Sequence, residues 1–293
     1  MPNAETVNVM PTSSLAESNT VGSVKIELEN VSLGYRHHVI LSELTFQVGP
    51  GEVVGIIGPN GSGKSTVIRA LTRIIAPIKG RILLSGRDIN AIERQHLARL
   101  LGVVPQLPLL PSAFTGFEIV LMGRNPHLGM FEHEKESDLK IAWESMEMTG
   151  TQDLARRSVG ELSGGQIQSL LIARALAQQT RAMLLDEPTA NLDIGRQIDV
   201  LDLIKRLSRE QGLAVLAALH DLNLASQYCD RLVLISDGRL FCQGTPSEVV
   251  TSANIEAVYG ADHCVYTHPV NGLPVVLVDG AGRLGLSQRS DQS

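Results

Sequence analysis

Residues 58–65 read GPNGSGKS, which matches the phosphate-binding pattern G-x-x-x-x-G-K-[ST]. Glycines allow such a loop to curl until its backbone N–H groups surround the phosphates of a nucleotide. At these spacings Lys64 reaches the β- and γ-phosphates, and the hydroxyl of Ser65 reaches Mg²⁺. An ordinary glycine-rich turn, the alternative, does not account for the lysine and the serine together. We therefore predict that the phosphates of a nucleotide and Mg²⁺ bind at this loop, through Gly58, Pro59, Asn60, Gly61, Ser62, Gly63, Lys64, Ser65 and Thr66.

Two adjacent carboxylates, Asp186 and Glu187, follow the apolar run AMLL at residues 182–185. A carboxylate at the end of a buried strand costs free energy unless it meets a cation. We expect Asp186 to meet the Mg²⁺ that Ser65 also holds. Glu187 is suited to take the proton from an attacking water, provided that it lies within hydrogen-bond reach. The alternative for Glu187 is an ordinary surface carboxylate.

Two further polar residues, Gln106 and His220, also follow apolar runs, LLGVV at residues 100–104 and LAVLAAL at residues 213–219. Phosphoryl transfer depends mainly on positioning and electrostatic stabilisation, which polar side chains of this kind supply. We expect His220 to contact the γ-phosphate and Gln106 to reach the same site. The alternative for each of the two residues is a purely structural role.

The stretch LSGGQ at residues 162–166 opens a predicted helix at residues 163–179. Ser163 is a favoured N-cap residue. The two glycines after it remove side chains from a helix N-terminus, where free N–H groups and the helix dipole attract anions. No lysine and no nucleophile with a base accompany the stretch. It therefore predicts half of an anion site whose other half lies elsewhere.

The strands that must position these residues are predicted from four apolar runs, of which the first is VVGII at residues 53–57. None of the four runs alternates with period two, so we predict strands that are buried on both faces of a parallel sheet. Ligands of open α/β sheets bind beyond the carboxyl ends of the strands. These strand ends are therefore expected to converge on one crevice, with helices at residues 64–75, 163–179 and 195–210 between them.

The composition, with 43% hydrophobic and 19% charged residues, is that of a globular protein. The net charge of −6 gives no reason to expect a nucleic-acid partner. Three scattered cysteines predict neither a disulfide framework nor a metal site and fit a reducing cytosol. No apolar run approaches the ~20 residues of a membrane helix, so a membrane would have to be crossed by another chain.

LSGGQ together with the phosphate loop, within residues 24–260, resembles the ATP-binding cassette (ABC) ATPases, whose signature sequence it matches. In that family two nucleotide-binding domains meet head to tail, and each signature covers the ATP on the partner's phosphate loop. The resemblance implies a homodimer with two composite sites. It also implies that Ser163, Gly164, Gly165 and Gln166 bind the γ-phosphate held by the other subunit, with Ser163 in direct contact.

The same resemblance assigns roles to single positions. Gln106 matches the Q-loop, which implies a catalytic role and a place as a Mg²⁺ ligand. Asp193 in ANLD matches the D-loop, and Tyr35 matches the aromatic residue that stacks on adenine, with a packed surface tyrosine as the alternative. His220 matches the switch histidine. The implied catalytic residues are Lys64, Gln106, Glu187 and His220, and the implied metal ligands are Ser65, Gln106 and Asp186. The chain departs from the family pattern at Ile167, Gln168 and Ser169, where basic residues often follow the signature.

The resemblance implies an α/β fold: a P-loop NTPase core with a mixed, mainly parallel sheet, an N-terminal antiparallel β subdomain and an inserted α-helical subdomain. A helix is expected within residues 134–148, and the Asp-Gly turn in RLVLISDGRLFCQG predicts a hairpin. Thr245, Pro246 and Glu248 predict a helix start with a capping box. The expected parts are a disordered tail without signal-peptide features (1–22), an ABC ATPase domain (23–260) whose helical subdomain spans 107–162, a C-terminal β extension (261–280) and a disordered tail (281–293).

Residues 120–131, VLMGRNPHLGMF, and residues 267–278, THPVNGLPVVLV, resemble segments of ABC ATPases that serve importers of iron–siderophore complexes, haem and cobalamin. This resemblance implies a peripheral ATPase on the cytoplasmic face of the cell membrane, bound to a permease dimer and linked indirectly to a substrate-binding protein. The first of the two segments would lie where the family touches its membrane partner. The alternative for GRNPH, residues 123–127, is a helix end followed by a turn.

Other functions fit parts of the pattern. An ABC ATPase of another transporter, such as an exporter, is the nearest alternative, although exporters often fuse the membrane domain to the cassette. A soluble ABC ATPase that acts on DNA or ribosomes usually carries two cassettes or a long coiled-coil insertion. A silent regulatory subunit is not expected to keep Lys64 and Glu187. The spacing of His263, Cys264 and His268 matches no standard metal-ligand set, so ordinary packing is expected there.

Overall fold

The computed structural model describes residues 23–35, 38–106, 110–129, 131–260 and 263–278. The disordered tails expected at residues 1–22 and 281–293 lie outside the described residues. Within the described ranges, none of the helices is both long and apolar enough to cross a membrane.

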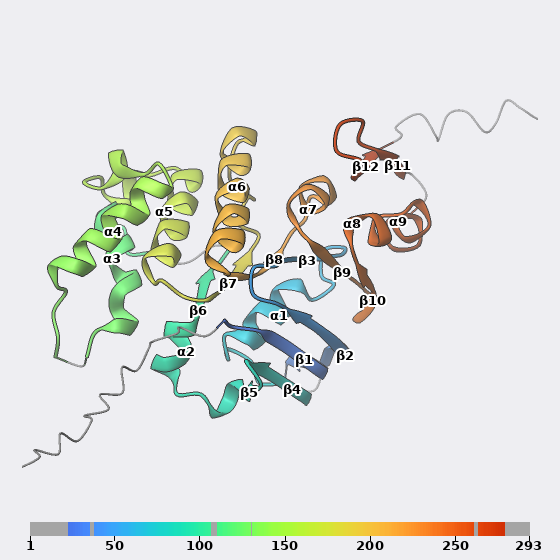
Figure 1. The fold of residues 1–293 in the computed structure, drawn as a ribbon, viewed down its shortest axis with the longest axis horizontal. Coiled ribbons are helices and arrows are strands. Elements are labelled where there is room, and N and C mark those ends of the chain that lie inside the picture. Colours follow the sequence, from blue (N-terminus) through green and yellow to red (C-terminus); the bar gives the residue numbers. More distant parts are fainter. Residues whose placement is uncertain (1–22, 36–37, 107–109, 130, 261–262, 279–293) are drawn as a thin grey trace, which may run out of the picture.

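A mixed sheet runs through the centre of the molecule (Figure 1). Its strands are β1 (Ile26–Tyr35), β2 (His38–Val48), β3 (Val53–Ile57), β4 (Lys79–Leu84), β5 (Arg87–Asp88), β6 (Leu101–Val104), β7 (Ala182–Asp186), β8 (Ala214–Ala218), β9 (Arg231–Ser236) and β10 (Arg239–Gly244). They are ordered β5-β4-β1-β2-β10-β9-β3-β8-β7-β6. The run from β9 to β6 is parallel, and every residue of β3, β7 and β8 is buried. The predicted α/β arrangement of buried parallel strands is confirmed.

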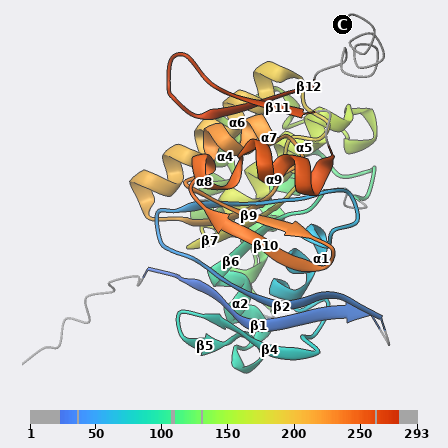
Figure 2. The ribbon, with the colours of Figure 1, turned by 90° about the vertical axis from the view of Figure 1, so that its right-hand side faces the viewer.

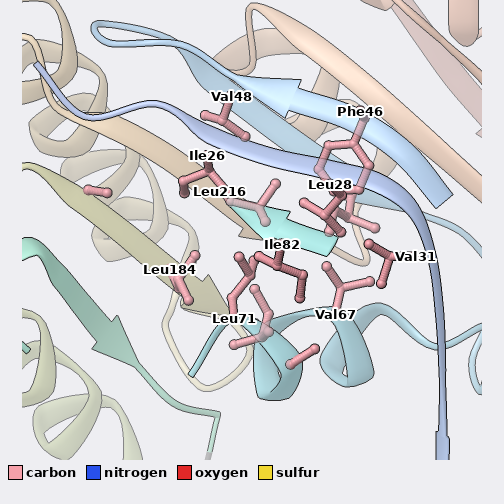
Figure 3. Close-up of a cluster of buried hydrophobic side chains, with 14 of the residues drawn as sticks. Ile26, Leu28, Val31, Phe46, Val48, Val67, Leu71, Ile82, Leu184 and Leu216 are labelled. Atoms are coloured by element: carbon pink, nitrogen blue, oxygen red, sulfur yellow. The ribbon is translucent and has the colours of Figure 1, made fainter. Parts of the chain in front are cut away.

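The N-terminal strands form an antiparallel region that joins the sheet through β2 and β10. Figure 3 shows apolar side chains of this region, among them Ile26, Leu28 and Ile82, gathered with Val67 and Leu71 of α1 (Lys64–Leu71). All five side chains are almost fully buried. This packing fixes the helix that follows the phosphate loop against the antiparallel region.

A group of helices is inserted between β6 and β7 and appears in green at the left of Figure 1. Its core is a separate cluster that includes Val120, Met146 and Leu170. The helix expected within residues 134–148 is present as α4. The elements are α3 (Gly116–Leu121), η2 (Met122–His127), α4 (Glu136–Met148), η3 (Gln152–Leu154), η4 (Val159–Glu161) and α5 (Gly164–Ala177), and before β6 lie η1 (Ile89–Ala91) and α2 (Arg94–Leu100).

The C-terminal half of the chain packs on the other face of the parallel strands. Thr245 and Glu248 form the predicted capping box, with Pro246 in the first turn, and the β9–β10 hairpin turns at its Asp-Gly pair as expected. A two-stranded hairpin follows, at the end of the molecule opposite β1 and β4 (Figure 2). The elements are α6 (Ile194–Gln211), α7 (Leu222–Tyr228), α8 (Pro246–Val249), α9 (Ser252–Tyr259), β11 (His263–Thr267) and β12 (Pro274–Val278).

Candidate functional site

The phosphate loop follows β3 and leads into α1, as its pattern predicts. Its backbone has φ of +150° at Gly58 and +104° at Gly63, values that favour glycine. At Gly58 a Cβ atom would stand 2.2 Å from the backbone oxygen of Ile235, so only glycine fits there. The ammonium of Lys64 lies over this loop, where Nζ donates to the carbonyl oxygens of Gly58 (2.8 Å) and Pro59 (3.1 Å).

Lys64 is only 5% exposed, so its ammonium has lost most of its contact with water. This desolvation lowers the pKa of Lys64, while the nearby charges of Glu187 and Asp186 act in the opposite direction. A phosphate bound in the loop would favour the charged ammonium in the same way, because an opposite charge at close range stabilises it.

Ser65 and Asp186 meet at the carboxyl end of β7. Ser65 Oγ donates a hydrogen bond of 2.9 Å to Asp186 Oδ1. Burial raises the pKa of the Asp186 carboxyl, and the hydrogen bond from Ser65 and the charges of Arg69 and Lys64 partly oppose this effect. Hydroxyl and carboxylate oxygens suit Mg²⁺, which usually takes one or two protein ligands and completes its shell with phosphate oxygens and water. The pair therefore fits a divalent cation, whose charge would also stabilise the buried carboxylate.

Glu187 stands where three strand ends meet. His220 Nε2, after β8, lies 2.6 Å from Glu187 Oε2, and Nε2 of Gln106, after β6, donates to the same oxygen. Glu187 is 8% exposed, and its φ of +52° is uncommon for a residue with a side chain. Such a conformation costs roughly 1–3 kcal/mol, and backbone strain of this kind gathers at functional sites. The structure thus brings the predicted catalytic residues Gln106, Glu187 and His220 together.

The LSGGQ stretch opens α5 as predicted, with Ser163 as the N-cap. The Ser163 hydroxyl accepts from Gln166 N–H at 3.3 Å, and Gln166 Oε1 accepts from Ser163 N–H at 3.0 Å, which forms a capping box. A cavity of about 540 Å³ lies beside the helix start and is lined in part by Gly164 and Gly165. Within the described part of the chain, no hydrogen bond or ion pair joins residues 162–166 to the phosphate loop. One chain does not unite the two predicted halves of the anion site.

Tyr35 ends β1 and is 39% exposed, so part of its ring is open to solvent. Its hydroxyl accepts a hydrogen bond of 2.9 Å from Nη1 of Arg69, which lies on α1, and this bond raises the pKa of Arg69. The predicted adenine-binding residue is therefore attached to the helix that follows the phosphate loop. Asp193 lies farther along the chain, where it caps α6 by accepting from the N–H of Arg196 at 2.9 Å.

Sequence reasoning missed Arg69 and Tyr259. Arg69 had a usable signal, because it stands one helical turn after Ser65 and so on the same face of the predicted helix. Tyr259 had none. Its hydroxyl is hydrogen-bonded to the backbone of Gly58, and burial raises the Tyr259 pKa to about 12. This contact joins the C-terminal helix α9 to the first residue of the phosphate loop.

The GRNPH segment forms the 3₁₀ helix η2, and the side chain of Arg124 turns inward. Arg124 is 6% exposed, and its Nε pairs with Asp138 Oδ1 of α4 at 2.9 Å. Its Nη1 donates to the carbonyl oxygen of Ala177, at the end of α5, at 2.7 Å. The pKa of Asp138 is lowered, first by a hydrogen bond from the backbone of Lys135 and then by Arg124. This arginine therefore ties helices of one subdomain together, and its guanidinium is not available to a partner chain.

Comparison with known proteins gives a consistent picture. The family model described as ABC transporter matches residues 41–190. The ferric enterobactin transport ATP-binding protein FepC of Escherichia coli (strain K12) is 40% identical over 258 residues, which cover 88% of this chain and 95% of that protein. A solved structure assigned to the metal-chelate type of ABC transporter, in an inward-facing conformation, matches with a TM-score of 0.75 and 29% identity over 87% of this chain and 97% of that one. The dimeric bacterial ABC transporter cassette MJ0796 matches with a TM-score of 0.68 and 29% identity over 75% of this chain and 98% of that one.

Proposed function

The chain belongs to the ABC transporter family, and from this premise we propose that it is the ATPase subunit that drives import of a metal chelate through a separate membrane permease. The observation that carries the hydrolytic part is the meeting of Gln106 and His220 on Glu187, next to the Ser65–Asp186 pair. Similarity to a ferric enterobactin ATPase and to a transporter of the metal-chelate type supports the choice of substrate.

In this proposal the phosphates of ATP lie on residues 58–66, and the adenine stacks on the exposed ring of Tyr35. Lys64 exchanges its two bonds to loop carbonyl oxygens for the β- and γ-phosphate oxygens. The exchange is favourable because a phosphate carries full negative charge and a carbonyl oxygen carries only a partial one. Arg69 supports this arrangement through its hydrogen bond to Tyr35.

Ser65 and Asp186 would hold Mg²⁺, with the side-chain amide oxygen Oε1 of Gln106 as a third ligand. Mg²⁺ usually takes few protein ligands, so phosphate oxygens of the nucleotide and water would complete its shell. When bound, Mg²⁺ offsets negative charge on the β- and γ-phosphates. The amide of Gln106 donates to Glu187 through Nε2, which leaves Oε1 free to act as an acceptor.

Glu187 acts as the base. Its carboxylate takes a proton from a water molecule while the water oxygen attacks the γ-phosphorus, and the bond from that phosphorus to the β,γ-bridging oxygen breaks. His220 Nε2 lies 2.6 Å from Glu187 in the structure, and with ATP bound its N–H would turn from the carboxylate to an oxygen of the γ-phosphate. Base catalysis of this type contributes about 10²- to 10⁴-fold to a rate. The products are ADP and inorganic phosphate.

The second half of the anion site comes from a partner copy of the chain. The Ser163 hydroxyl accepts from Gln166 N–H but keeps its own proton, so it remains able to donate to a phosphate oxygen. Because Gly164 and Gly165 have no side chains, their backbone N–H groups at the helix start are open to an anion. The similar cassette MJ0796 is dimeric. In the proposed dimer, two copies of this chain meet head to tail, which would place this helix start over the γ-phosphate of the other subunit. ATP then favours the closed dimer because both subunits contact it only in that state.

The partners in this proposal are a permease dimer in the membrane and, through it, a substrate-binding protein. The ATPase sits on the cytoplasmic face of the membrane, bound to the permease. The test is to purify the tagged chain from detergent-solubilised membranes and to measure uptake of ⁵⁵Fe-loaded siderophores in cells that lack its gene. We expect a permease to co-purify and uptake to fall. Association only with ribosomes or DNA, with normal uptake, would overturn the transport function and leave the ATPase.

A further inference from the structure

The C-terminal segment, residues 252–260 and 263–278, consists of α9 and the β11–β12 hairpin and lies outside the central sheet. The two strands pair with each other from His263–Val278 to Thr267–Pro274. The hairpin packs against α7 and α9, and Figures 1 and 2 both show it beside these helices. Val276 of β12 is 9% exposed and belongs to the apolar cluster under the parallel strands. The segment is therefore part of the folded core, although it adds no strand to the central sheet.

Asn223 connects this hairpin to α7. Its Oδ1 accepts from Val276 N–H at 2.7 Å, and its Nδ2 donates to Val276 O at 3.2 Å. A primary amide that makes both bonds pairs with the strand much as a neighbouring peptide group does, so both its distance and its orientation are fixed. The side chain of Asn223 is thus held by the backbone of β12.

The backbone of Asn223 is held from the other direction by Asp221. The Asp221 carboxylate caps α7 by accepting from the N–H groups of Asn223 (2.7 Å) and Leu224 (3.0 Å). His220 directly precedes this cap and lies 2.6 Å from Glu187. Since α7 has only 7 residues, its own hydrogen bonds are too few to fix its place, and contacts with its neighbours decide it. Bonds and adjacent residues therefore run unbroken from Val276 to Glu187.

The other end of the same segment contacts the phosphate loop. Tyr259, the last residue of α9, is hydrogen-bonded to the backbone of Gly58. The C-terminal segment therefore contacts both the loop that is proposed to hold the phosphates and the helix that follows the proposed catalytic histidine. A segment with only a packing role has no need of polar contacts to these two places.

We propose that the C-terminal segment positions His220, because β12 fixes the first turn of α7 through the pair of bonds between Asn223 and Val276. Asn223 is a positioning residue: it acts through His220 and does not touch the nucleotide. This inference rests on the role proposed above for His220. A displacement of about 1 Å in a catalytic group is enough to lower a rate by up to 10²-fold.

The test uses the full chain and a double-mutant cycle. Asn223→Ala removes both bonds to Val276, and we expect kcat for ATP hydrolysis to fall roughly tenfold while the KM for ATP changes less than about twofold. In a His220→Ala background, the added Asn223→Ala change should lower the remaining single-turnover rate by less than about twofold, since the positioned group is gone. Equal losses in both backgrounds would show a general structural effect and overturn the inference.

Two further variants serve as controls for the effect of Asn223→Ala. Asn271→Ala removes a bond from the hairpin loop to Gln227, in the last turn of α7, and should leave kcat within about twofold of the wild type. Asn223→Asp keeps an acceptor for Val276 N–H but loses the donor, so its kcat should lie between those of the wild type and Asn223→Ala; it decides the matter if the alanine variant does not fold. If kcat falls in His220→Ala as expected but does not fall in either Asn223 variant, this inference is overturned and the role proposed for His220 stands. Wild-type activity in His220→Ala would overturn the role proposed for His220 as well.

Discussion

His220 Nε2 and Glu187 Oε2 lie 2.6 Å apart, although the two residues follow different strands of the sheet. Glu187 follows β7 and His220 follows β8, and these strands are parallel neighbours. Their carboxyl ends therefore face the same side, together with the end of β3, where the phosphate loop begins. The strand order therefore brings the residues of the site together. We expect single substitutions to change base catalysis, nucleotide binding and stability separately.

Glu187→Gln should remove the base while it keeps the shape of the side chain. We expect hydrolysis to fall by about 10²- to 10⁴-fold, and the bound ATP to hold two chains together because it is no longer consumed. Size-exclusion chromatography with Mg-ATP should show a dimer for this variant. Hydrolysis at the wild-type rate would show that Glu187 is not the base.

Lys64→Ala should abolish hydrolysis and weaken nucleotide binding, since a charged contact to the phosphates is lost. Loss of a charge-assisted hydrogen bond of this kind costs about 1.5–3 kcal/mol, or roughly 10- to 150-fold in affinity. Titration with a fluorescent ATP analogue measures the change. Lys79→Ala, at an exposed position of β4, is the matched control and should bind as the wild type does. Unchanged affinity in the Lys64 variant would remove the loop from the proposed site.

Ser163→Arg should block hydrolysis without reducing the affinity of the single chain for ATP, because Ser163 is proposed to act on the partner's nucleotide. A mixture of Ser163→Arg and Lys64→Ala chains tests this by complementation. Mixed dimers contain one site with an intact lysine from one chain and an intact serine from the other. We expect ATPase activity to return on mixing. No recovery, in mixtures shown to contain mixed dimers, would contradict the head-to-tail arrangement.

Asp186 gives a pH-dependent prediction for stability. Burial raises the pKa of its carboxyl, so the folded chain holds this proton more tightly than the unfolded chain does. The stability that this group contributes is present below the ordinary carboxyl pKa and is lost as the pH rises through the raised value. Asp186→Asn should therefore unfold at a higher temperature than the wild type at neutral pH without nucleotide, although it should not hydrolyse ATP. Melting curves from acid to neutral pH measure the difference, which should shrink as the pH falls; a variant less stable than the wild type at neutral pH would contradict the argument.

Arg124→Ala should destabilise the helical subdomain strongly, because it leaves the carboxylate of Asp138 buried without its partner. Breaking a buried pair in this way costs about 3–5 kcal/mol. Arg81, which pairs with Glu29 on the surface, offers a matched control, and Arg81→Ala should cost no more than about 1 kcal/mol. Urea unfolding of both variants compares the two pairs. Equal and small effects would show that Arg124 does not hold the subdomain together.

Much of the site follows from local sequence. The apolar runs and the residues after them were enough to predict that Ser65, Asp186, Glu187 and His220 come together, because parallel strands end on the same side of a sheet. The inward turn of Arg124 was not predictable, since its buried partner Asp138 lies on another helix. The contacts of Asn223 and Tyr259 were equally hidden: both depend on how the C-terminal segment packs, and no periodicity in the sequence records that.

The contacts of Gln106 and His220 with one oxygen of Glu187 determine when the proposed base can act. With Gln106 hydrogen-bonded to Oε2 and Nε2 of His220 lying 2.6 Å from it, this oxygen is a poor proton acceptor for water until one of the two side chains turns to the nucleotide or its cation. Binding of the nucleotide would therefore both fill the site and release this oxygen to act as the proposed base.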